Sequence, residues 1–349
     1  MTITFEAEFT TKDGTKLYTK SWKPDSGTIS AVLIFLHGFS DHINAYYDLF
    51  PTLSSAPFNI AVYGFDQRGW GRSVHKTSDH GLTGPTSLVL SDIHDFILYV
   101  AAIFGKEEKE PVSQQKPFFL MGHSMGGNEL LSYLLSTSQA YSNDNRPPIA
   151  GCLLEAPYIE LDPLEQPSAM TVVAGKMAAS VMPHKQLKRP LNAAFLSRST
   201  KVQQDWIDDP LCHDTGTLEG LKGLLQRAGD LSALSHGRKV GGLTNKLPCP
   251  VWMSHGTADK VTSFPAAERL FNVLEAPRSD KVFRSYGGGY HKLHAEPDGL
   301  AERFANDAGS WILGQARRFS PDTKVSVAFD FTSLIAVHVA HQNSQNPKL

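Results

Sequence analysis

A glycine-rich corner of the sequence holds a serine that could act as a nucleophile. Residues 122–126 read Gly-His-Ser-Met-Gly and match the pattern G-x-S-x-G, with an apolar run before them and a helical pattern after them. In a strand, sharp turn and helix of this kind, small neighbours let strand and helix pass closely, and the serine side chain stands clear of the backbone. This context predicts that Ser124 attacks an acyl group, although the pentapeptide alone also fits a plain glycine-rich turn.

Two residues further along the chain could activate Ser124. Serine is a poor nucleophile unless a histidine takes its proton, and that histidine needs a carboxylate to hold its tautomer. Asp259 and His291 each follow an apolar strand pattern, in a loop that contains glycine. The chain order Ser124, Asp259, His291 is that of α/β-hydrolases. We predict a catalytic triad, while a turn-forming Asp259 and an ordinary loop His291 are the simpler interpretations.

His294 is the alternative to His291 as the catalytic base. The two histidines could also form a metal pair at helical spacing, but the sequence has no H-E-x-x-H pattern or cysteine pair that would complete a zinc site. His291 is preferred because it directly follows Tyr290 and the glycine run 287–289, which leaves His294 to enter the next helix. We expect neither a metal nor an organic cofactor.

Backbone N–H groups must stabilise the negative oxygen that forms when a serine attacks an ester. Met125 follows the nucleophile, and Phe39 lies in the loop after an earlier apolar strand, so we predict these two residues as the oxyanion donors. In the same region His37 is expected to be a structural hydrogen-bonding residue. Asp66 and Arg68 are expected to hold the neighbouring loop by charge-assisted hydrogen bonds.

The predicted site residues all follow strands, so a parallel sheet would bring them to one edge. The apolar runs that predict these strands lie at 30–36, 59–65, 118–122, 149–154, 249–254 and 281–286. Helical spacing between and after them lies at 43–56, 87–104, 265–274 and 299–318. This alternation predicts an α/β-hydrolase fold with a mostly parallel central sheet and helices on both faces. Before it, alternation over 5–22, broken at Asp13 and Gly14, predicts a hairpin of two edge strands.

The strand pattern lapses between residues 157 and 246. Helical spacing at 168–182 and 217–233 predicts a helical cap inserted into the fold. The predicted organisation is therefore a first part of the hydrolase core at 1–156, the cap at 157–246, a second part of the core at 247–319 and a C-terminal extension without an assigned role at 320–349.

Composition limits the classes of partner and compartment. The formal net charge is −2 and the isoelectric point is about 6.7, which disfavours a nucleic acid partner. The first residues lack the pattern of a secretory signal, and we expect no apolar run near the roughly 20 residues that span a bilayer. Cys152, Cys212 and Cys249 lack metal-ligand spacing and are expected to be free, buried thiols. These observations favour a cytoplasmic protein.

Taken together, these motifs resemble the monoacylglycerol lipase family of α/β-hydrolases, particularly its fungal members. The resemblance covers residues 5–318 and depends on the motifs at 37–42, 66–73, 122–127, 255–259 and 289–296. It implies Ser124 as the nucleophile with Asp259 and His291 as partners, and Phe39 and Met125 as oxyanion donors. It also implies a small lipid ester as substrate and a cap that touches membrane or lipid-droplet surfaces.

The expected reaction is the cleavage of monoacylglycerols to glycerol and fatty acid through an acyl-serine intermediate. A lysophospholipase, a thioesterase or a general carboxylesterase could use the same triad. A charged headgroup would need basic residues near the site, and the candidates are Arg68, Arg72, Lys185, Lys188 and Arg189. An alternative of another class is an inactive hydrolase that serves as a lipid-binding or scaffold module. The sequence leaves the oligomeric state open.

Overall fold

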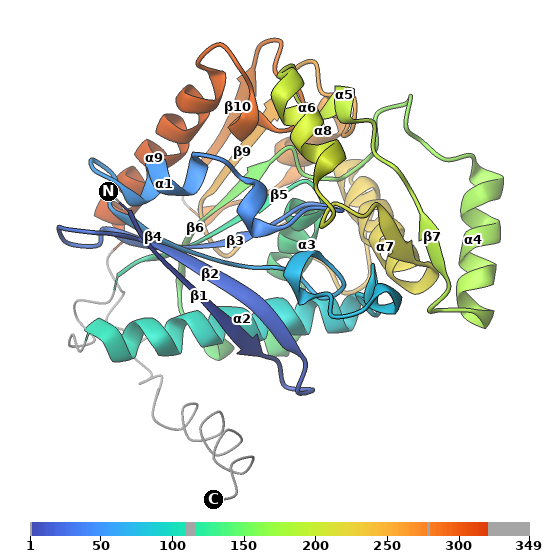
Figure 1. Ribbon diagram of the computed structural model, residues 1–349, viewed down its shortest axis with the longest axis horizontal. Coiled ribbons are helices and arrows are strands. Elements are labelled where there is room, and N and C mark those ends of the chain that lie inside the picture. The colour runs from blue at the N-terminus through green and yellow to red at the C-terminus, as the bar shows by residue number, and fades with distance from the viewer. Residues whose placement is uncertain (1, 109–115, 278–279, 320–349) are drawn as a thin grey trace, which may run out of the picture.

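A central sheet organises the protein. The computed structural model describes residues 2–108, 116–277 and 280–319 (Figure 1). Its eight-stranded sheet has the order β1-β2-β4-β3-β5-β6-β9-β10. The strands are β1 (Thr2–Thr10), β2 (Lys16–Pro24), β3 (Ala31–Leu36), β4 (Ile60–Phe65), β5 (Phe118–His123), β6 (Ile149–Glu155), β9 (Val251–Gly256) and β10 (Lys281–Tyr286). From β4 to β10 all neighbours pair in parallel, which confirms the predicted α/β-hydrolase fold.

The predicted hairpin is present, but only one of its strands is an edge strand. β1 and β2 pair antiparallel, and β2 also pairs antiparallel with β4 through Thr19 to Trp22. The prediction of two edge strands was therefore wrong for β2. The physical reason is burial: Leu17 and Trp22 of β2 are covered by the core, whereas Phe5 of β1 is 71% exposed.

Helices cover both faces of the sheet. β3 is apolar at every position because both of its faces are buried. Val32 and Ile34 belong to one hydrophobic cluster, and Leu33 and Phe35 belong to the other. The first cluster includes side chains of α2, α3 and α8, and the second includes side chains of α1 and α9. These helices are α1 (Leu49–Ser54), α2 (Thr86–Glu108), α3 (Met125–Leu134), α8 (Phe264–Val273) and α9 (Leu300–Arg318).

The helix predicted at 43–56 is shorter than expected. A 3₁₀ turn spans Ile43–Ala45, and α1 begins only at Leu49. Between them Tyr47 has a φ of 47°, in the left-handed region. A residue in that region cannot continue a right-handed helix, so the segment is broken there.

α2 is longer than the predicted helix at 87–104 and is strongly apolar. Its window Thr86–Phe104 is the one helical segment in the described part of the chain that is long and apolar enough to cross a membrane. The expectation that no run approaches this length was therefore wrong. In the fold 61% of the window is buried, and Ile93 and Phe96 pack in the core beneath the sheet.

The segment between β6 and β9 forms the cap. It contains α4 (Ala169–Val181), β7 (Gln186–Lys188), α5 (Ala193–Leu196), α6 (Thr200–Asp208), β8 (Thr215–Thr217) and α7 (Leu218–Ser235). The two helices predicted by spacing are α4 and α7, and each begins after a side-chain N-cap, at Ser168 and Thr217 respectively. The pair β7–β8 and the helices α5 and α6 were not predicted, because elements this short show little periodicity. The extension predicted at 320–349 lies outside the described residues.

Part of the cap is fixed to the core. The N–H of Asp214 donates to Ser40 Oγ at 2.7 Å, and Thr217 Oγ1 donates to the carbonyl of Gly81 at 2.9 Å. Leu231 and Leu234 of α7 belong to the main core cluster. α4, in contrast, lies at the outer end of the molecule, on the far side of α7 from α3 (Figure 1).

Candidate active site

Ser124 lies in a strained corner between β5 and α3. Its φ of 53° and ψ of −115° are unusual for a residue other than glycine. The corner requires small neighbours, since a Cβ atom at Gly122 would lie 2.5 Å from the carbonyl oxygen of Gly126. A Cβ atom at Gly126 would lie 2.3 Å from the carbonyl oxygen of Leu36. The glycines of the motif therefore allow β5, α3 and the end of β3 to meet, and Ser124 stands at their junction.

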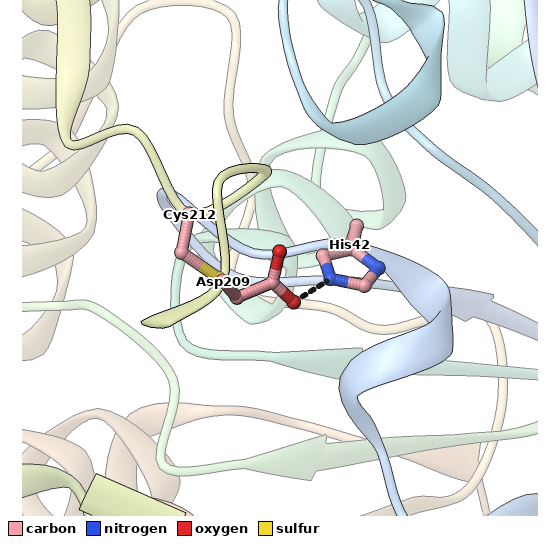
Figure 2. A group of neighbouring side chains, drawn as sticks. All are labelled: His42, Asp209 and Cys212. Carbon is pink, nitrogen blue, oxygen red and sulfur yellow. Dashed lines mark hydrogen bonds and ion pairs between the residues drawn. The ribbon is translucent and has the colours of Figure 1, made fainter. Parts of the chain in front are cut away.

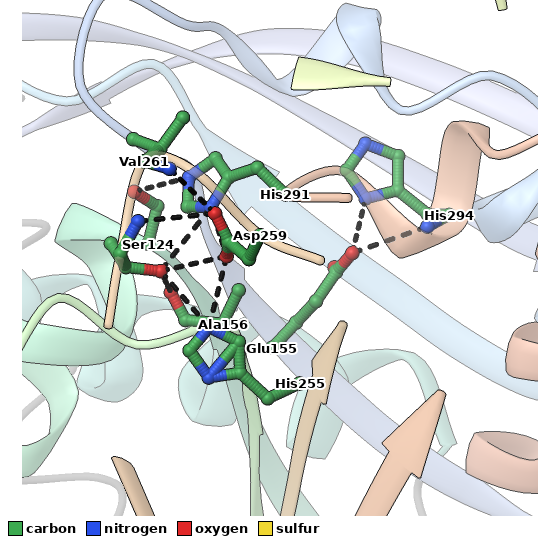
Figure 3. Close-up of polar contacts among 9 residues, drawn as sticks. Ser124, Glu155, Ala156, His255, Asp259, Val261, His291 and His294 are labelled. Atoms are coloured by element: carbon green, nitrogen blue, oxygen red, sulfur yellow. Dashed lines mark hydrogen bonds and ion pairs between the residues drawn. The ribbon is translucent and has the colours of Figure 1, made fainter. Parts of the chain in front are cut away.

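The structure brings Ser124, His291 and Asp259 into one hydrogen-bonded chain (Figure 3). Ser124 Oγ lies 2.9 Å from His291 Nε2, and His291 Nδ1 lies 2.9 Å from Asp259 Oδ2. Each residue follows the carboxyl end of a strand, namely β5, β9 or β10. All three are buried, so water competes little with these contacts. The geometry allows the hydroxyl to donate to Nε2 while Nδ1–H donates to the carboxylate.

The loop after β9 keeps Asp259 ionised. Its Oδ1 accepts hydrogen bonds from the N–H groups of Val261 at 2.8 Å and Thr262 at 3.1 Å. Burial by itself would raise the pKa of Asp259, but the charge and hydrogen bond of His291 outweigh it and hold the pKa below the ordinary value. Asp259 is thus a carboxylate suited to orient a histidine.

A second histidine contacts the same carboxylate. His255 Nε2 lies 2.9 Å from Asp259 Oδ2, at the far side from His291 (Figure 3). Burial lowers the pKa of His255 to about 4, so its ring is neutral near pH 7 and donates Nε2–H. His255 is the first residue of the motif 255–259, and no role of its own was predicted for it. Its place four residues before Asp259 was the available signal.

His294 has a different partner from His291. Its Nδ1 lies 2.7 Å from Glu155 Oε1, and its backbone N–H donates to the same oxygen at 3.2 Å. It lies in a 3₁₀ turn, Leu293–Ala295, so the expectation that it enters the next helix was wrong. The reason is that Glu155, at the end of β6, holds this segment in a tight turn. His294 and His291 do not form the metal pair considered from the sequence, since His291 contacts Ser124 and Asp259 instead.

The predicted oxyanion donors border the nucleophile. Phe39, Met125 and Ser124 line the same cavity. Among the described residues, no group accepts a hydrogen bond from the N–H of Phe39 or Met125. Both amides can therefore donate to an oxygen bound at Ser124.

Buried polar residues hold the Phe39 loop in place. His37 Nε2 accepts a hydrogen bond from the N–H of Gln67 at 2.8 Å, so His37 has the structural contact expected of it. Asp66 accepts from the N–H groups of Ile43 at 2.9 Å and Arg72 at 2.7 Å.

Arg68 is held by carboxylates. Its Nε donates to Asp92 Oδ2 at 2.8 Å, and its Nη2 pairs with Asp13 at 3.0 Å. Like Asp66, it therefore has the bracing role predicted from the sequence.

A largely apolar cavity of about 180 Å³ opens from Ser124 into the cap. Its lining joins the core to both long cap helices. The apolar lining residues include Tyr158, Leu161, Val172, Leu187, Leu191, Leu218, Leu221, Leu224, Leu225 and Val261. Charged residues in the lining are Glu165, Lys176, Arg189 and Lys222, all from the cap.

The sequence matches the profile of the hydrolase family described as serine aminopeptidase, S33, over residues 27–298. The chain belongs to this family. A protein of Schizosaccharomyces pombe, provisionally named a monoglyceride lipase, is 31% identical over 302 residues, covering 86% of this chain and 72% of the relative. The monoglyceride lipase of Mus musculus is 28% identical, covering 86% and 88%. These relatives confirm the resemblance stated from the motifs.

Solved structures support the fold of this S33-family hydrolase. A soluble variant of monoglyceride lipase from Saccharomyces cerevisiae, crystallised with a substrate analogue, superposes with a TM-score of 0.74. The alignment covers 89% of this chain and 94% of the yeast chain at 22% identity. At that identity the comparison shows a shared fold.

Two groups of possible metal ligands occur among the residues described. One consists of His123, Glu155 and His294, and the other of His42, Asp209 and Cys212. Neither group includes Ser124, Asp259 or His291.

Proposed function

We propose that this S33-family hydrolase cleaves monoacylglycerols to glycerol and a free fatty acid. The observation that carries the proposal is the chain Ser124, His291, Asp259, with contacts of 2.9 Å, in which Ser124 also lines a cavity of mainly apolar side chains. The names of the relatives support the same substrate class. The contacts also favour an active enzyme over a scaffold that has lost its triad.

Acylation uses the geometry directly. Ser124 Oγ forms a bond to the ester carbonyl carbon while its proton moves to His291 Nε2. The N–H groups of Phe39 and Met125 stabilise the resulting negative oxygen, and Asp259 stabilises the imidazolium. The carbon–oxygen bond to glycerol then breaks, and His291 Nε2 gives its proton to the departing glycerol oxygen.

Deacylation repeats the same steps with water. His291 Nε2 takes a proton from a water molecule, whose oxygen attacks the acyl carbon. The bond between that carbon and Ser124 Oγ then breaks, and Oγ recovers the proton from His291. The products are the free serine and a fatty acid.

The cavity supports the binding of an apolar acyl chain. Leucines of α7 and Val172 of α4 can bury an acyl chain, since burial of each CH₂ group contributes about 0.8 kcal/mol. Of the five basic residues proposed from the sequence for a charged headgroup, only Arg189 lines the cavity. Arg68 is neutralised by Asp92 and Asp13. Lys176 and Lys222 also border the cavity, so the choice of a monoacylglycerol over a lysophospholipid depends on the names of the relatives.

The proposal is tested by hydrolysis of matched substrates with purified protein. We expect 1-oleoylglycerol to be cleaved faster than dioleoylglycerol, lysophosphatidylcholine or p-nitrophenyl butyrate. Ser124→Ala should lower the rate by about 10⁴-fold or more, whereas Ser180→Ala, on an exposed face of α4, should not change it. A Ser124→Ala protein with the wild-type rate would contradict the mechanism. Turnover of only the p-nitrophenyl ester would contradict the lipid substrate, and failure of a fluorophosphonate to label Ser124 would favour the scaffold alternative.

We also propose that the protein contacts membranes or lipid droplets through α4, from the cytoplasmic side. Met170, Val173, Met177 and Val181 recur at helical spacing and are 81%, 57%, 69% and 81% exposed. Exposed apolar side chains gathered on one helix face are typical of an interfacial contact. The opposite side of α4 borders the cavity through Val172 and Lys176. A lipid could therefore pass from the surface under α4 to Ser124.

A further inference from the structure

A group of three ligand-type side chains lies where the cap meets the core, outside the hydrogen-bonded chain of the active site. His42 follows Asp41 in the loop after β3, while Asp209 and Cys212 belong to the turn after α6 (Figure 2). One ligand atom from each residue lies within 4.8 Å of the other two. An imidazole, a carboxylate and a thiol are all zinc ligands.

The local backbone pre-positions two of these ligands. The N–H of Cys212 donates to the carbonyl of Asp209 at 3.1 Å, and the N–H of Leu211 donates to Asp209 Oδ1 at 2.8 Å. This turn directs Asp209 Oδ2 to His42 Nε2, 2.8 Å away. Cys212 is half-buried beside them, and within the described ranges no hydrogen-bond partner contacts its thiol. The contact between His42 of the core and Asp209 of the cap therefore does not involve the thiol of Cys212.

The electrostatic surroundings of the thiol suit a cation. The carboxylates of Asp41, Asp209 and Asp214 act electrostatically on Cys212, as does the ammonium group of Lys292. Negative charge around the three side chains favours the binding of a divalent cation.

We propose that His42 Nε2, Asp209 Oδ2 and Cys212 Sγ bind a zinc-type divalent cation, with solvent as the fourth ligand. At zinc bond lengths of about 2.0 to 2.3 Å, tetrahedral ligand atoms lie roughly 3.3 to 3.7 Å apart, so the three side chains need only small movements. Binding breaks the hydrogen bond between His42 and Asp209. The Cys212 proton passes to solvent, and the imidazole proton moves from Nε2 to Nδ1.

The bound metal would lock the cap to the core. It would connect the loop that holds Phe39 to the turn between α6 and β8, and so stabilise the closed arrangement of this side of the cap. The site adds no group to the hydrolytic reaction. It is a binding site whose existence is independent of the proposed substrate.

The first test measures metal binding without any substrate. Chelator-treated, reduced protein is titrated with Zn²⁺ against a chromophoric competitor, and with Cd²⁺ while thiolate-to-cadmium absorption is recorded. We expect one equivalent of metal per chain, a cadmium–thiolate band and a higher melting temperature. Because one proton is released, the affinity should rise about tenfold per pH unit while the thiol is protonated. Binding without the band, or no binding, would overturn the proposal.

Variants identify the ligands. Cys212→Ser should abolish the band, while Asp209→Asn and His42→Gln should each weaken binding about 10-fold or more. His184→Ala, which removes an exposed histidine elsewhere on the cap, should bind as wild type. A band that persists in Cys212→Ser would show adventitious binding only. If that variant fails to fold, iodoacetamide labelling of the wild-type protein decides the question, since Zn²⁺ must protect Cys212 from alkylation.

Discussion

Glu155 connects the two loops that carry Ser124 and His291. Its backbone carbonyl accepts the N–H of Ser124 at 2.9 Å, and its side chain holds both the ring and the N–H of His294, three residues after His291. The side chains of Glu155 and His294 are fully buried. Because a displacement of about 1 Å can cost 10²-fold in rate, we expect this buried clamp to position His291.

Substitution of Glu155 tests this role. Glu155→Ala should lower kcat about 10- to 100-fold with little change in KM, because the clamp orients His291 and does not touch the acyl chain. Glu155→Gln keeps an acceptor oxygen for the N–H of His294 and should recover much of the loss. Steady-state kinetics with 1-oleoylglycerol makes the comparison. Equal kcat for all three proteins would show that the contact is only structural.

At the scale of the elements, a buried charged pair joins cap helix α7 to α3, the helix that follows Ser124. Arg227 Nη2 donates to Glu129 Oε1 at 3.1 Å, and Arg227 Nε donates to Asn128 Oδ1 at 3.0 Å. Both charged side chains are at least 95% buried. Burial raises the pKa of Glu129 to about 7, and the charge of Arg227 offsets this only in part.

This pair predicts a pH dependence of stability. The pKa of Glu129 is about 7 in the folded state, against an ordinary value of 4.5. The stabilisation of the folded state by protonated Glu129 is therefore complete below pH 4.5 and is lost as the pH rises to 7. A difference of that size corresponds to about 3 kcal/mol of unfolding free energy. Urea unfolding of wild type and Glu129→Gln should show the wild type losing that amount relative to the variant between pH 4.5 and 8.

The control for this measurement is Glu268→Gln, which removes an exposed negative charge from α8. This variant gives the change in unfolding free energy that is expected from the loss of one surface charge. A difference between wild type and Glu129→Gln that is constant over the whole pH range would contradict the prediction.

At the scale of the whole molecule, α4, which carries the exposed Met170, Val173, Met177 and Val181, lies at the end of the cap farthest from the sheet (Figure 1). The cap turn at Asp209–Asp214 and α7 are tied to the core, so α4 is the part of the cap that can face a lipid surface. The protein has a net charge of only −2, so global electrostatics contribute little to membrane binding. The proposed contact with lipid therefore depends on these apolar side chains.

Substitution on α4 should separate surface binding from chemistry. Met170→Asp combined with Met177→Asp should lower binding to phosphatidylcholine vesicles, and hydrolysis of vesicle-borne 1-oleoylglycerol, about tenfold or more. Hydrolysis of soluble p-nitrophenyl butyrate should stay unchanged. Ile207→Asp, at an exposed apolar residue of α6, is the matched control and should bind vesicles as wild type. Equal vesicle binding by the double variant would contradict the membrane proposal.

The sequence by itself determined the sheet, most of its helices and the residues now found at the site. Strands such as 118–123 were predictable because a strand buried on both faces must be apolar throughout. Ser124, Asp259 and His291 were predictable because serine chemistry requires these residue types, and parallel strands present their ends at one edge. Short elements such as β7, β8 and α6 contain too few residues to show a clear hydrophobic period, so they were not predicted.

Only the tertiary structure decided the partners of the other buried polar groups. Glu155 meets His294 across 139 residues, and His42 meets Asp209 across 167. Arg227 of the cap meets Glu129 of the nucleophile helix across 98 residues. No local period or motif encodes such pairs. They form because a polar group enclosed by the core or the cap must find a partner there, and packing alone determines which one is within reach.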